Sequence, residues 1–316
     1  MRRLSALNSK EMLYMIAIAE SGSLSRAAEK LDMSQSSLSR SLQKIENSLN
    51  VSLFKRTPGG LIPTDAGKKY LLCAKQIMKM TRDLENEISQ INHLQSGHLV
   101  IGTTSQFGAV VLPEILRTFS GVYPGIEIEL VEKDPNVIEA KLLDGSVDLA
   151  LLHLPLANTG IPYQQICSEN LLLMVPSSDA VNDLITEQPI GDLPFLDLQL
   201  VSNRNFILTR PTQGTRRAAQ RILDAAGIRP RIKFETCNIH TVMRLVSFGL
   251  GVSIVPSSYC SMLSNISASV RFYRIEERYF PHWEFVVCFL SEDSLTEAAL
   301  EFIQICKTTL PYLFKS

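Results

Sequence analysis

The chain has 316 residues, 45% of them hydrophobic, which exceeds one typical domain and is enough for two or more cores. It holds no apolar run of about eighteen residues, and its first segment lacks an apolar stretch with a cleavage site, so we expect a cytoplasmic protein rather than a membrane or secreted one. The net charge of −1 hides an asymmetry, because residues 1–70 hold eleven Lys and Arg against six Asp and Glu, and only this basic part is expected to meet a polyanion.

Three short helices are predicted in residues 8–49. Asn8 is suited to cap the first helix, which ends at Gly22. Ser23 then caps a second short helix, and Ser34 caps a third. Two short helices, a tight turn and a third helix with one apolar face make a helix-turn-helix.

The third helix carries two contrasting faces. Its apolar residues recur every three or four positions, at Leu38, Leu42, Ile45 and Leu49. Its other face carries short hydrogen-bonding groups and one guanidinium, and residues 34–45 contain no Asp or Glu. A helix that reads base edges in a major groove needs these features. On an ordinary helical hairpin the same face would simply be solvated.

A β-hairpin wing is predicted directly after the helix-turn-helix. A short apolar strand leads into the turn Pro58-Gly59-Gly60, a second apolar stretch follows, and Thr64 caps the next helix. The module is therefore a winged helix-turn-helix. For phosphate contacts we expect Arg26, Ser34, Lys55 and Arg56. For base contacts we expect Gln35, Ser36, Ser39, Arg40 and Gln43.

Residues 65–96 read as one long helix with a heptad seam. The seam residues alternate in steps of four and three, at Tyr70, Ala74, Ile77, Thr81, Leu84, Ile88 and Ile91. About thirty helical residues span roughly 45 Å, which favours pairing with the same helix of a second chain. The alternative is packing against its own domain. A dimer would give two recognition helices the spacing of a two-fold DNA site.

The remainder of the chain alternates predicted strands and helices. Strands are expected at 98–104, 126–133 and 148–155, with helices between them, and a second strand-helix set follows from Asn170 to Ser258. This rhythm indicates parallel strands with helical crossovers, arranged as two α/β lobes.

The stretch Ala17 to Gly67 resembles the DNA-binding region of the LysR-type transcriptional regulators almost without gaps. The segments "IGTTSQFGAVVLPEIL", "YPGIEIELVE", "LLDGSVDLAL" and "LVSFGLGVSIVP" resemble the effector half of the same family. The chain departs from the family at Ser36, where many members have Pro, and at Gly59 and Ile62, where the wing often carries Arg or Lys. With fewer cations, the wing is expected to contribute less to the affinity for DNA.

The resemblance implies a two-lobed effector domain of the type-2 periplasmic-binding-protein fold, with its ligand between the lobes. We expect domains at 1–64, 65–96 and 97–316, with lobe I at about 97–163 and 267–316 and lobe II at about 164–266. It also implies a homodimer or homotetramer on double-stranded operator DNA, a small-molecule effector, and contact with RNA polymerase.

Hydroxyls and free backbone N–H groups at strand-helix junctions favour an anionic effector. Arg210 adds a fixed positive charge for a carboxylate. Alternatively these hydroxyls only cap helices. The expected effector residues are Thr103, Thr104, Ser105, Gln106, His153, Thr209, Arg210, Thr212, Gln213, Ile239 and His240.

Other chemistries find little support in the sequence. No nucleophile-base-acid set, phosphate loop or CxxC spacing occurs among the six cysteines, so we expect no enzyme, cofactor or metal. Cys237 beside a predicted helix start offers an alternative, redox sensing, because a thiolate there would have a lowered pKa. A solute-binding protein would explain the second half, but it would need a signal peptide and would leave the first half without a purpose.

Overall fold

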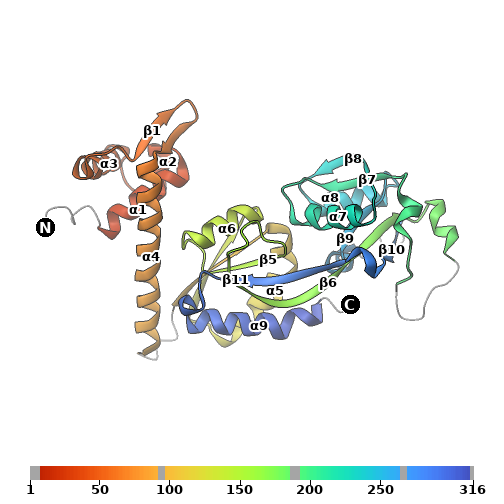
Figure 1. The fold of residues 1–316 in the computed structure, drawn as a ribbon. Helices are drawn as coiled ribbons and strands as arrows, with labels where there is room; N and C mark the ends of the chain where they lie inside the picture. Colours follow the sequence, from red (N-terminus) through yellow and green to blue (C-terminus); the bar gives the residue numbers. More distant parts are fainter. Residues whose placement is uncertain (1–7, 92–96, 186–192, 264–268, 314–316) are drawn as a thin grey trace. The chain divides into compact units, whose positions relative to one another are not determined.

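The computed structural model describes residues 8–91, 97–185, 193–263 and 269–313 (Figure 1). The chain divides into two compact units, one holding residues 1–98 with 143–146 and the other residues 99–142 with 147–316.

The amino-terminal module is built from three helices and a hairpin. They are α1 (Ser9–Ser21), α2 (Leu24–Lys30), α3 (Gln35–Leu49), β1 (Phe54–Thr57) and β2 (Gly60–Pro63). Met15, Ile18, Ala27, Leu38 and Ile45 are buried together in the core of this module. The predicted helix-turn-helix with its hairpin wing is therefore present.

The wing is attached through backbone contacts. Glu46 on α3 accepts the N–H groups of Leu53 and Phe54 at 2.6 and 3.2 Å, which holds the start of β1 against the helix. Leu61 donates its N–H to the carbonyl of Gly22 at 2.8 Å. Gly60, at φ 117°, passes so close to Gly22 that a Cβ would lie 2.5 Å from that carbonyl oxygen, so glycine is required there.

Asn8 caps α1 as the sequence predicts, because its side chain accepts the N–H of Lys10 at 2.9 Å. Replacing Asn8 with alanine is expected to lower the free energy of unfolding of this module by about 1 kcal/mol, while Asn8→Ser keeps most of it. Thermal unfolding followed by circular dichroism measures both. Equal loss in the two variants would contradict a capping role.

Helix α4 (Asp65–Ile91) follows the wing. Its start packs on the amino-terminal core through Leu71 and Tyr70. Further along, Met80, Leu84 and Ile88 are exposed by 71%, 55% and 49%, which leaves an apolar seam on the helix surface. Residues 92–96, the predicted end of this helix, lie outside the described residues.

The second unit is a mixed α/β structure whose sheet is ordered β10-β6-β11-β5-β3-β4, with β9 paired to β6. Its strands are β3 (Gly97–Thr103), β4 (Ile126–Glu132), β5 (Leu149–His153), β6 (Tyr163–Pro176), β7 (Asn205–Thr209), β8 (Arg231–Thr236), β9 (Ser253–Pro256), β10 (Val270–Arg274) and β11 (His282–Cys288). Its α-helices are α5 (Ser105–Val122), α6 (Pro135–Leu143), α7 (Gly214–Ala225), α8 (Ile239–Ser247) and α9 (Glu297–Leu313).

The expectation of parallel strands is only partly right. β3 pairs with β5, and β7 with β8, in parallel, but β6 pairs antiparallel with β9, β10 and β11. The parallel pairs are those joined by a helical crossover, whereas strands that return from the far end of the chain run the other way.

Figure 1 shows β6 and β11 running between two lobes of this unit, and they pair over residues 163–170 of β6. Helices α5 and α9 pack against the first lobe through Phe119 and Phe302, and α7 packs in the second lobe against Phe206. The sequence placed residues 267–316 with lobe I. Tyr273 and Tyr279 are buried in the same hydrophobic core as Phe206 of the second lobe, so we propose instead that residues 270–279 belong to lobe II.

Candidate functional site

Helix α3 presents its polar face outward because its apolar face is fixed in the core. Leu38, Leu42 and Ile45 are at most 7% exposed. Of the predicted DNA contacts, all are exposed except Ser39, which is half-buried; the exposed ones are Arg26, Ser34, Gln35, Ser36, Arg40, Gln43, Lys55 and Arg56. The predicted apolar residue Leu49 is 37% exposed, since it lies at the end of the helix.

The start of α3 is rich in hydroxyls. Ser34 caps the helix by accepting the N–H of Ser37 at 3.2 Å, as predicted, and its hydroxyl also meets those of Ser36 and Ser37. Arg40 donates from Nε to the carbonyl of Ser36 at 3.3 Å.

A groove of about 260 Å³ lies beside this helix start, between α2, α3 and the wing. Arg56, Gln35 and the hydroxyls of Ser23 and Ser25 line it. Ser25 donates to Gln35 at 3.3 Å, which orients that amide. The groove has the positive charge and hydroxyl donors that fit a phosphate oxygen. Ser23 was predicted to cap α2, but its side chain makes no capping hydrogen bond and instead lines this groove. Ser25 was not predicted, because the fold rather than the spacing brings it to Gln35.

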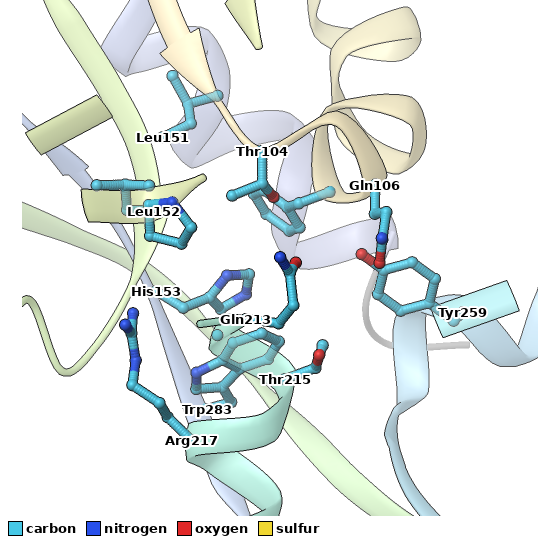
Figure 2. Close-up of a pocket in the computed structure, with 13 residues that line it drawn as sticks. Thr104, Gln106, Leu151, Leu152, His153, Gln213, Thr215, Arg217, Tyr259 and Trp283 are labelled. Atoms are coloured by element: carbon cyan, nitrogen blue, oxygen red, sulfur yellow. The ribbon is translucent and has the colours of Figure 1, made fainter. Parts of the chain in front are cut away.

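The second unit contains a pocket where its two lobes meet (Figure 2). It is lined by Thr104, Gln106, Phe107, Pro135, Leu151, Leu152, His153, Gln213, Gly214, Thr215, Arg217, Tyr259 and Trp283. The space left free in it is about 30 Å³, roughly that of one water in the liquid. The pocket's own side chains therefore leave little room for a ligand.

His153 is held in an aromatic cage. Its ring stacks on Trp283 at 3.7 Å between centroids and 16° between planes, and it makes an edge-to-face contact with Phe107 at 4.3 Å between centroids. Trp283 donates its Nε1–H to the carbonyl of Leu154 at 3.0 Å. A Cβ on Gly214 would lie 3.1 Å from the Trp283 ring, so a glycine lets the start of α7 approach it.

Behind His153 lies Glu169 of β6, whose side chain is fully buried. One carboxylate oxygen contacts His153 Nε2 at 3.1 Å and the other accepts the N–H of Ser258 at 3.1 Å. Burial, with the nearby charge of Glu169, raises the pKa of Cys167 and of Cys260 to about 12 and also raises the pKa of Tyr259. These groups stay neutral, which leaves His153 and Glu169 as the polar pair beneath the pocket.

Three helices of the second unit begin near this pocket, and two of them lack a side-chain cap. Thr104 before α5 and Gln213 before α7 make no capping hydrogen bond, whereas Asn238 caps α8 by accepting the N–H of His240. The first N–H groups of α5 and α7, beside the pocket residues Thr104 and Gln213, therefore have no side-chain cap. Together with Arg217 they favour negative charge there.

Amide side chains bridge the two lobes across the pocket. Gln106 on α5 donates to the carbonyl of Cys237 and accepts the N–H of Ile239 at 3.1 Å. Gln213 donates to Asp134 at 3.0 Å. These bridges hold the closed arrangement.

Four of the eleven sequence-predicted effector residues line the pocket, namely Thr104, Gln106, His153 and Gln213. Thr103 does not, because it is buried and donates to the carbonyl of Leu151 at 3.0 Å. Thr209 is buried against Thr215, Ile239 is buried, and His240 packs on Tyr259. Ser105, Arg210 and Thr212 are exposed and outside the lining.

The guanidinium and the aromatic residues of this pocket were not predicted from the sequence. Arg217 lies one turn inside α7, while Tyr259 and Trp283 come from distant segments. In the sequence Trp283 stands out only as the single tryptophan. The one available signal is the helical period, which places Arg217 on the same face as Gln213 and Gly214.

Among the residues that the structure describes, no group of three or more His, Cys, Asp or Glu could hold a metal ion. No helix in the same part of the chain is long and apolar enough to cross a membrane.

Comparisons with known proteins match both halves of the chain. The family model "Bacterial regulatory helix-turn-helix protein, lysR family" matches residues 9–68, and "LysR substrate binding domain" matches residues 92–311. The HTH-type transcriptional regulator YcgK of Bacillus subtilis (strain 168) is 30% identical over 307 residues, which cover 91% of this chain and 95% of the relative.

Solved structures share the fold at lower identity. A full-length OxyR variant from Pseudomonas aeruginosa is 18% identical with a TM-score of 0.70, covering 96% of this chain and 97% of its own. Full-length CbnR complexed with its target DNA is 22% identical with a TM-score of 0.62, covering 95% and 99%. With the helix-turn-helix module, the long helix α4 and the two-lobed α/β unit in place, this chain belongs to the LysR family, and it is a DNA-binding transcriptional regulator with an effector-binding domain, not an enzyme.

Proposed function

We propose that this regulator binds a partly palindromic operator through α3 and the wing, and that a small anionic effector in the pocket around His153 changes this binding. The proposal that the effector is anionic rests on one observation. Two helices without side-chain caps, α5 and α7, begin at the same pocket, and Arg217 also lines it. A carboxylate there would accept backbone N–H groups and pair with a guanidinium.

The proposed readers of the operator are the polar groups on the outer face of α3, all exposed except the half-buried Ser39. Gln35, Ser36, Ser39, Arg40 and Gln43 are assigned to base edges, with phosphate contacts from Arg26, Ser34, Lys55 and Arg56. The exposure of this face and the basic groove beside it support the assignment.

We further propose a homodimer or homotetramer assembled in the cytoplasm through α4. Its exposed Leu84 and Ile88 are apolar residues that a second copy would cover. Contact with RNA polymerase stays a prediction.

The effector is proposed to act by separating the lobes. A pocket with room for about one water admits a metabolite only when the Gln106 and Gln213 bridges break. A ligand that binds the open arrangement better shifts the equilibrium, whereas equal affinity for both would shift nothing.

Replacing Arg217 with glutamine is expected to abolish the effector response while operator binding stays normal, because the carboxylate loses its guanidinium partner. The test screens small carboxylates by thermal shift on the full chain, where a ligand at a hundred times its Kd adds about 2.7 kcal/mol. Operator binding is then measured with and without the ligand found.

Arg210→Gln is the matched control, because it removes an equal charge that lies outside the pocket lining. A normal response in Arg217→Gln, or loss in Arg210→Gln alone, would move the site. If only neutral or cationic compounds shift the melting temperature, the anionic assignment is wrong.

Redox sensing through Cys237 is the weaker alternative. Cys237 is exposed, but Cys167 and Cys260, with pKa values raised to about 12, are poorly suited to attack or resolve an oxidised thiol. Peroxide-dependent operator binding that disappears in Cys237→Ser would favour it.

A further inference from the structure

A second basic cavity lies on the outer face of α7, apart from the bridges that close the effector pocket. Ala218, Ala219, Ile222 and Leu223 are buried and fix the rotation of the helix. The opposite face therefore bears the charged residues. The cavity measures about 500 Å³ and is lined by Pro211, Arg216, Arg217, Gln220, Arg221 and Asp224. This volume is within the range of roughly 300–1,000 Å³ that suits small metabolites.

The three arginines differ in how their charge is already satisfied. Arg216 pairs with Glu235 at 2.5 Å and donates to the carbonyl of Thr209. Arg217 donates to Asn136, a neutral amide, at 3.4 Å. Arg221 donates to the carbonyls of His282 and Phe280. In the described part of the chain, neither Arg217 nor Arg221 is paired with a carboxylate.

Arg221 is also pre-positioned for an anion. The two carbonyls hold one end of its guanidinium, and its Nε is buried without a hydrogen-bond partner among the described residues. An oxyanion in the cavity would meet the other terminal nitrogen of Arg221, Nη1, which makes no hydrogen bond with the described residues.

The far end of the cavity has the opposite preference. Asp224 accepts from Gln220 Nε2 at 2.8 Å and has free acceptor capacity on its carboxylate. It repels a second anion and accepts from a hydroxyl group. The lining therefore fits a ligand with a strongly anionic group at one end and a hydroxyl group at the other.

We propose that this face of α7 is a second ligand site, which binds the phosphate of a small hydroxylated phosphate monoester at Arg217 and Arg221 and its hydroxyl at Asp224. Arg217 lines both cavities, and Figure 2 shows it extending from α7 beside Trp283. A phosphate bound to Arg217 therefore reduces the positive charge in the first pocket. Binding of one ligand is expected to change the affinity for the other.

Isothermal titration calorimetry of the full chain at constant ionic strength tests this with inorganic phosphate and glycerol 3-phosphate. The wild type should bind the ester more tightly than the inorganic ion. Arg221→Gln should weaken both by about tenfold, the loss of a charge-assisted contact. Asp224→Asn should tighten inorganic phosphate severalfold and reduce the preference for the ester.

Arg229→Gln is the charge-matched control, because Arg229 is exposed and outside the lining. Equal weakening in Arg221→Gln and Arg229→Gln would reduce the site to general surface charge and overturn the proposal. So would unsaturable binding by the wild type, or weaker phosphate binding in Asp224→Asn. Arg221 and Asp224 do not line the pocket around His153, so these two variants test the second site while the lining of the first pocket, including the shared Arg217, is unchanged.

Discussion

Arg40→Ala is expected to weaken operator binding by about 1–3 kcal/mol and to relax the preference for one base pair, because a guanidinium in the major groove pairs with the edge of a guanine. Arg40 is exposed on the polar face of α3, and its Nε bond to Ser36 fixes the direction of the side chain. Binding is measured on the operator and on variants with single base-pair changes, at one stated salt concentration.

Lys55→Ala is the comparison for this measurement. Lys55 is exposed on β1, the first strand of the wing, where phosphate rather than base edges would meet it. Its loss should weaken binding to all DNA sequences similarly. It should also reduce the slope of log affinity against log salt concentration by about one. An Arg40 variant that keeps the full base preference would show that this face does not read the groove.

Local signals were enough to predict the amino-terminal module. Asn8 and Ser34 cap their helices, and the wing pairs Phe54 with Pro63 and Thr57 with Gly60. Caps and tight turns depend on neighbours in sequence, so their residues reveal most of them. The predicted cap at Ser23 was wrong, because its side chain makes no capping hydrogen bond to α2. The ion pair between Glu11 of α1 and Lys44 of α3, at 2.7 Å, could not be predicted in this way, because it joins residues far apart in the sequence.

The sheet of the second unit was harder to predict, and β6 shows why. The sequence suggested a strand from Asn170, where apolar residues begin, but the strand starts at Tyr163. Its first half is polar or half-exposed and is held by backbone pairing with β11. Pairing with a distant strand satisfies the backbone without needing an apolar pattern, so hydropathy does not reveal it.

The pocket was predictable only where helix starts mark it. Thr104 and Gln213 precede helices and line the pocket. Thr103 is one residue earlier, so the alternation of a strand turns its side chain into the sheet. Trp283 and Tyr259 line the same pocket because the order of the strands in the sheet brings them there. That order cannot be read from the residues near them in the sequence.

The buried pair under the pocket joins different parts of the second unit. His153 ends β5, Glu169 lies on β6, and Ser258 follows β9, so one carboxylate ties three segments together. The side chains of His153 and Glu169 are 6% and 0% exposed. A buried polar group needs hydrogen-bond partners, because without them the free energy lost on removing it from water is not recovered.

Glu169→Ala is therefore expected to lower the free energy of unfolding by about 3–5 kcal/mol, since it leaves His153 and the Ser258 N–H buried without their acceptor. Glu169→Gln keeps an acceptor oxygen but loses the charge, so its cost should be smaller. Chemical denaturation of the full chain measures both, and a double variant with His153→Ala tests the coupling. If Glu169→Ala costs no more in the wild-type background than in the His153→Ala background, the pair does not stabilise the fold and His153 is held by its aromatic cage alone.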